Sequence, residues 1–106
     1  MSVIRFEAAI EGRCVSYAES NGYISRKVQW AGRRGAPDRF FSSPRTGPFF
    51  VEFKDPAGAL SKLQEMEIGI LKAYGTPVFV IRSFDAFVEL LEILEGPENP
   101  LRGGAA

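Results

Sequence analysis

The chain has 106 residues, and its 13 lysines and arginines balance its 13 aspartates and glutamates, so net charge provides no attraction to nucleic acids or membranes. Its hydrophobic fraction of 45% and charged fraction of 25% are those of a globular domain. One cysteine and no histidine exclude an internal disulfide, a Cys/His zinc site and histidine-based catalysis, so a bound metal would need the oxygen ligands typical of Mg²⁺, Mn²⁺ or Ca²⁺.

A helix is predicted first, because apolar residues recur at helical spacing from residue 3 to about residue 20. Asn21-Gly22 can end this helix, since both residues tolerate a left-handed backbone. Residues 24–30 alternate imperfectly and predict a strand. A glycine-rich, basic loop follows over residues 31–37.

Two further strands are predicted on either side of a short turn. Residues 38–42 have an extended pattern, and residues 49–54 are rich in aromatic and β-branched residues. The turn at residues 44–48 contains two prolines and a glycine, and its shortness implies an antiparallel hairpin. Four phenylalanines of this hairpin are expected to fill the core or, in part, to form a dimer face: Phe40, Phe41, Phe49 and Phe50.

The second half of the chain predicts a helix, a strand and a last helix. The first of these helices begins at the capping-box spacing of residues 61–64 and ends near Tyr74-Gly75. Residues 77–81 are wholly apolar and predict a buried strand. A helix is expected over residues 83–94, and residues 95–106 are expected to be a disordered tail.

Together these elements predict an α/β fold, a small mixed β-sheet flanked by helices, in one domain over residues 1–94. The helix between the third and fourth strands implies a parallel crossover. The first residues lack the basic stretch and apolar run of a signal peptide, and no segment is apolar enough to span a membrane. We therefore expect a soluble, cytoplasmic protein.

Acidic residues of the predicted hairpin indicate a cation site. Glu52 lies within the most hydrophobic strand, and Lys54 projects from the same face because side chains alternate along a strand. Asp38 follows Pro37 at the start of the neighbouring strand, and the hairpin can bring it close to Glu52. Two carboxylates beside an ammonium are suited to hold a divalent cation and to activate a water molecule. The alternative is a solvent-facing ion pair between Glu52 and Lys54.

These residues also resemble a known signature. Pro37-Asp38 and Glu52-Phe53-Lys54 are similar to the two halves of the PD-(D/E)xK nuclease signature. The two halves and three further segments together resemble the virus-type replication-repair nuclease (VRR-NUC) family in motif order. The further segments are the preceding basic loop, residues 60–64 and the helix end near Gly75. The resemblance runs from the first helix to about Ile81. It implies the restriction-endonuclease-like α-β-β-β-α-β core, which is also the predicted order.

The resemblance implies a Mg²⁺- or Mn²⁺-dependent DNA endonuclease. Asp38 and Glu52 would be metal ligands, assisted by the main-chain carbonyl of Phe53. Lys54 would orient the attacking water and stabilise charge on the phosphate. Gln64 would face the site, although it is equally suited to the capping box, and both roles can coexist if only its backbone is used in the cap.

The family also places an acidic residue on the first helix, and two candidates stand one turn apart. Glu7 lies nearer the apolar stripe and is better placed to point toward the sheet. The spacing from Glu11 to the glycine that ends the helix is similar to the corresponding spacing in related junction resolvases. We favour Glu7 and leave Glu11 open. Either residue could instead be an ordinary exposed charge on the helix surface.

The balanced total hides an uneven distribution of charge. Residues 26–45 hold six basic residues and one acid, whereas residues 83–99 hold five acids and no base. A basic loop with small residues beside the proposed metal site suits the approach of phosphates. The candidate DNA contacts are Arg26, Lys27, Arg33, Arg34, Arg39 and Lys62. Nothing in the sequence predicts readout of bases, so selectivity for DNA structure is expected.

The leading hypothesis is a stand-alone, metal-dependent nuclease that acts on branched DNA in replication, repair or recombination. The resemblance implies a homodimer with two active sites, similar to Holliday-junction resolvases, in the cytoplasm of a bacterial or phage-infected cell. The alternative is a non-catalytic DNA-binding or protein-interaction module on a decayed nuclease fold. The occupied motif positions argue against that alternative.

Overall fold

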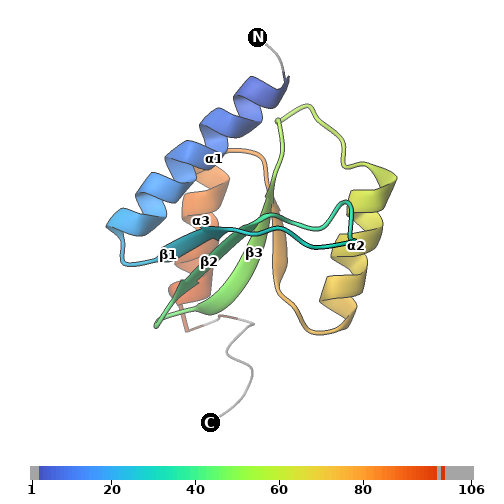
Figure 1. Ribbon diagram of the computed structural model, residues 1–106. Helices are drawn as coiled ribbons and strands as arrows, with labels where there is room; N and C mark the ends of the chain where they lie inside the picture. The colour runs from blue at the N-terminus through green and yellow to red at the C-terminus, as the bar shows by residue number, and fades with distance from the viewer. Residues whose placement is uncertain (1–2, 98, 100–106) are drawn as a thin grey trace.

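The computed structural model describes residues 3–97 and residue 99 (Figure 1). Most of the predicted tail over residues 95–106 therefore lies outside the described part. Within the described residues, no helix is long and apolar enough to cross a membrane.

The described chain forms the predicted order of elements. The elements are α1 (Val3–Ser20), β1 (Ile24–Lys27), β2 (Arg39–Ser43), β3 (Gly47–Phe53), α2 (Lys62–Ala73), β4 (Val78–Ile81) and α3 (Phe84–Glu95). The first strand ends at Lys27, three residues earlier than predicted. Val28 still donates its N–H to the carbonyl of Asp38, but the chain then leaves the sheet and Trp30 packs on Phe50, with ring centroids 5.4 Å apart.

The four strands form one mixed sheet in the order β1-β2-β3-β4. The pairs β1/β2 and β2/β3 are antiparallel, and the pair β3/β4 is parallel. The hairpin and the parallel crossover through α2 are therefore confirmed. The protein has the α/β fold that its sequence predicts, a small mixed sheet with helices packed on it.

The two faces of the sheet differ in what covers them. Figure 1 shows α1 and α3 packed together on one side of the sheet and α2 apart from them. On the α1/α3 side, Phe41 and Phe49 are fully buried and form the centre of the core. Because side chains alternate along strands, Phe40 and Phe50 lie on the other face, where Trp30 packs beside them. The four phenylalanines of the hairpin are thus divided between the two faces.

Candidate active site

The candidate site lies where β2 begins and β3 ends. Arg39 is paired with Val51 across the hairpin, so the same register brings Asp38 opposite Glu52. Side chains alternate along β3, so Glu52 lies on the face of the sheet that α2 covers and the buried Val51 lies on the other face. Lys54 shares that face, and its main-chain N–H donates to the carbonyl of Ile81, which continues the pairing of β3 with β4. The hairpin therefore places two carboxylates and one ammonium at the end of the sheet where β2 begins and β3 ends.

Several charged groups at this end of the sheet act on the pKa of Glu52. Burial raises its pKa from 4.5, the negative charge of Asp38 raises it further, and the ammonium of Lys54 lowers it. The charges of Glu7 and Glu11 on α1 also raise it, and the resulting pKa is about 7. Acidic groups on α1 and just before β2 thus act on one half-buried carboxyl of β3. Such a group is stabilised in its ionised form by a cation.

Gln64, in the first turn of α2, links this helix to Glu52. Its side-chain Oε1 accepts the main-chain N–H of Ser61 at 2.8 Å, while its Nε2 donates to Oε2 of Glu52 at 3.3 Å. The hydroxyl of Ser61 accepts the main-chain N–H of Gln64 at 3.1 Å, which completes the capping box. Gln64 thus uses both its backbone and its side-chain oxygen in the cap, and its side-chain nitrogen still contacts Glu52.

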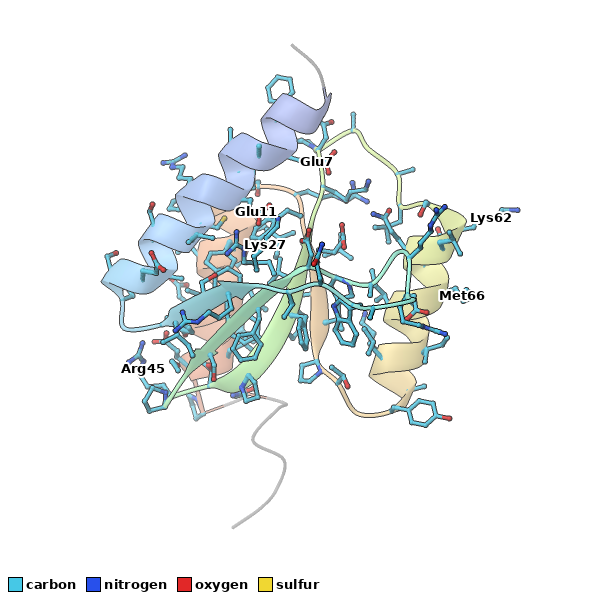
Figure 2. All side chains as sticks on the ribbon, in the orientation of Figure 1. Glu7, Glu11, Lys27, Arg45, Lys62 and Met66 are labelled. Carbon is cyan, nitrogen blue, oxygen red and sulfur yellow. The ribbon has the colours of Figure 1, made fainter. Side chains whose placement is uncertain are left out.

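The two acidic residues of α1 have different surroundings. Glu11 is mostly buried, and its Oε2 lies 2.8 Å from Nε of Arg39 and 3.2 Å from Nζ of Lys27. Lys27 also lies 3.2 Å from Oδ2 of Asp38. Figure 2 shows Glu11 and Lys27 facing each other between α1 and the sheet, whereas Glu7 lies nearer the N-terminal end of α1. Among the described residues, Glu7 has no hydrogen-bond or ion-pair partner, so its carboxylate is the one available to a ligand.

The basic loop between β1 and β2 is attached to α2. The guanidinium of Arg33 forms an ion pair with Glu67, whose side chain is buried. Gly35 has a φ of +83°, and a Cβ at that position would lie 2.6 Å from the main-chain carbon of Leu63. The loop backbone therefore rests directly on the first turn of α2. Sequence analysis missed Glu67, because an acidic residue on a helix gives no sign that a loop will cover it.

The other candidate DNA contacts are spread over the surface. Arg34 is exposed and forms no ion pair or hydrogen bond with the described part of the chain, and Lys62 is exposed at the start of α2. Arg26 lies on the edge strand β1 and donates to the carbonyl of Ser25 at 2.8 Å. Arg39 is mostly buried against Glu11, so it lies inside the fold rather than with the exposed cations of the loop.

The donor set can be compared with the needs of a divalent cation. In the part of the chain that the structure describes, no three acidic or cysteine side chains are grouped as a ready-made metal cage. Mg²⁺ does not require one, because it is commonly held by one or two carboxylates together with waters and substrate phosphate. Asp38 and Glu52 supply two such carboxylates. Their hard oxygen donors suit Mg²⁺ or Mn²⁺, and the main-chain carbonyl of Phe53 stays a predicted ligand.

The raised pKa of Glu52 predicts how stability depends on pH. Between about pH 4.5 and about pH 7, the folded chain holds a proton on Glu52 that the unfolded chain has released. The free energy of unfolding contributed by this group is therefore expected to fall as pH rises through that window. Glu52→Gln should remove this decrease, so that the variant is more stable than the wild type above pH 7. Urea unfolding in EDTA at several pH values measures it, with the exposed Glu89→Gln as the control.

Comparisons with known proteins bear on the fold that carries these residues. A solved structure described as a VRR_NUC domain is 32% identical to the chain, with a TM-score of 0.73. The alignment covers 81% of this chain and 94% of that structure. No protein-family model matches the chain, and no curated protein matches it.

Proposed function

The chain belongs to the VRR-NUC family and has a nuclease fold, and from this premise we propose that it is a Mg²⁺- or Mn²⁺-dependent DNA endonuclease. The observation that carries the proposal is the position of Glu52, half-buried at the sheet edge among Asp38, Lys54 and Gln64. A structural role does not require acids from α1 and from the start of β2 to act on the Glu52 carboxyl, since their repulsion raises its pKa.

In the proposed mechanism, Asp38 and Glu52 would hold the cation, with the main-chain carbonyl of Phe53 and the carboxylate of Glu7 as further ligands. A bound divalent cation would lower the pKa of a water molecule and offset the negative charge of the scissile phosphate. Lys54 projects from the same face as Glu52 and would donate to the attacking water or to a phosphate oxygen. Gln64 fixes the orientation of the Glu52 carboxylate, because its own amide is held by the cap of α2.

The surroundings of the site support DNA as the substrate. Arg34 and Lys62 are exposed on the loop and on α2 near Gln64, where they can contact phosphates on either side of the scissile bond. Such contacts carry no sequence information, so we propose selectivity for branched DNA structures. A homodimer with two such sites could cut both strands of a junction in replication, repair or recombination. Phe40 and Phe50, which are partly exposed, are available for a dimer face.

The test is cleavage of labelled DNA of defined structure. A four-way junction, a flap, a single strand and a plain duplex would each be incubated with Mg²⁺, Mn²⁺ or EDTA. We expect metal-dependent cutting of at least one substrate and no cutting in EDTA. Binding without cutting of any substrate would contradict the proposal and favour the non-catalytic module.

The loop also predicts a salt dependence. Arg34→Ala is expected to weaken DNA binding and to make the dependence of log affinity on log salt concentration about one unit less steep, because one phosphate contact is lost. Filter binding in EDTA at a series of salt concentrations measures the slope. Lys72→Ala, at the exposed end of α2, is the matched control and should leave the slope unchanged. An equal slope in the wild type and Arg34→Ala would show that DNA does not follow the loop.

A further inference from the structure

A groove lies between the basic loop and α2, next to the candidate active site. Figure 1 shows the loop that follows β1 reaching across to α2. The groove has a volume of about 540 Å³, which lies in the range of small-ligand sites. Its lining includes Trp30, Arg33, Arg34, Leu63, Met66 and Glu67.

The walls of the groove carry apolar side chains, and one of them, Trp30, is held by contacts within the fold. The indole N–H of Trp30 donates to the carbonyl of Pro37 at 2.6 Å, and its ring packs on Phe50. These two contacts hold the indole in place. On the opposite wall, Leu63 is 45% exposed and Met66 is 51% exposed. An aromatic ring and a thioether facing one groove make a surface on which a flat, apolar group can pack.

The rim of the groove is cationic. Arg33 is neutralised by the buried Glu67, and this ion pair keeps the loop against the helix. Arg34 is exposed and forms no ion pair or hydrogen bond with the described residues, so its guanidinium is available to an anion. An apolar wall beside an available guanidinium matches the two parts of a nucleotide, a base that stacks and a phosphate that carries charge. A plain duplex does not present this combination, because its base faces are covered by neighbouring pairs.

The groove is continuous with the site. Leu63 in its wall is adjacent in the chain to Gln64, which donates to Glu52. The backbone of Gly35 rests on the same two residues of α2. A nucleotide in the groove would therefore be a near neighbour of the phosphate at Glu52.

We propose that the groove binds an unpaired nucleotide of the DNA substrate, with its base against Trp30 and Met66 and its phosphate at Arg34. The inference rests on the proposed nuclease function and specifies its substrate, DNA with an unpaired strand at the cleavage point. A duplex without an unpaired nucleotide would leave the groove empty and would be cut more slowly than a flap or a frayed end.

The single tryptophan of the chain makes a direct test possible. A short oligothymidylate in EDTA, where cleavage does not occur, should quench the fluorescence of Trp30. The double variant Leu63→Ser/Met66→Ser should bind this probe about tenfold more weakly, the loss expected when a base loses its stacking surface. Ile93→Ser, an equally exposed apolar residue of α3, is the matched control and should bind like the wild type.

Cleavage separates this inference from the proposed function. In Mg²⁺, the double variant should lose about tenfold of the preference for flap over duplex that the wild type shows. A wild type that cuts DNA, combined with a double variant that keeps both the probe affinity and the flap preference, would overturn the groove inference alone. A wild type that cuts none of the substrates would overturn the proposed function together with the groove inference that rests on it. Absence of quenching by the probe would also overturn the groove inference.

Discussion

Asp38→Asn is expected to lower the rate of DNA cleavage on the order of 10³-fold or more, the size of loss seen when a central catalytic group is removed. The substitution removes one of the two carboxylates that the hairpin brings together, and the neutral amide is a poor ligand for Mg²⁺. The side chain of Asp38 is 54% exposed and its ion pair with Lys27 is at the surface, so the fold should be little affected. Initial cleavage rates at saturating metal, together with binding to DNA in EDTA, measure the two effects.

The matched control is Asp85→Asn, which replaces an exposed aspartate in the first turn of α3. It should cleave at the wild-type rate. Glu52→Gln should lose cleavage as Asp38→Asn does, while gaining stability above pH 7, so activity and stability are expected to change in opposite directions. If Asp38→Asn and Glu52→Gln both cut DNA at the wild-type rate, the site has been wrongly assigned.

Gly35→Ala is expected to destabilise the chain by about 3 kcal/mol and to impair cleavage. Its positive φ is unfavourable for alanine, by roughly 1–2 kcal/mol. In addition, the new Cβ would overlap the main chain of Leu63 and Gln64, and overpacking of this kind costs roughly 1–3 kcal/mol more. The overlap is relieved by moving the loop and the first turn of α2 apart, and because Gln64 lies in that turn, its contact with Glu52 would be disturbed. Urea unfolding and cleavage rates measure the two consequences.

Gly32→Ala separates the two causes. Gly32 has a similar φ of +73°, but nothing lies within 4 Å of a Cβ built there. This variant should therefore show only the conformational cost and should cleave DNA nearly as well as the wild type. Equal losses of stability and activity in the two variants would mean that the contact between Gly35 and α2 does not position the site.

Much of the fold could be predicted because its signals are local. The aromatic and β-branched composition of residues 49–54 and the capping box at Ser61 and Gln64 each depend on neighbours within a few residues. The antiparallel hairpin followed from the short turn, and its register brings Asp38 opposite Glu52. The end of β1 at Lys27 could not be predicted, because it depends on the packing of Trp30 against Phe50, a residue from another strand.

The less predictable parts of the site are contacts between elements distant in the sequence. The helical pattern leaves both Glu7 and Glu11 as candidates for the site, whereas the ion pair of Glu11 with Arg39 depends on how α1 packs on β2. The ion pair between Arg33 and Glu67 depends on the path of the loop across α2. No local pattern specifies such pairs, since each partner alone has the sequence signature of an exposed charge.

The most direct test of the central claim, that Asp38 and Glu52 form a divalent-cation site, is a calorimetric titration of the chain with Mn²⁺ in the absence of DNA. We predict that the wild type binds Mn²⁺ at about pH 8 and more weakly at about pH 6, where Glu52, with its pKa of about 7, is largely protonated. Glu52→Gln should bind at least about tenfold more weakly, whereas Glu89→Gln should bind like the wild type. Equal Mn²⁺ affinity in the wild type and Glu52→Gln, at both pH values, would contradict the claim.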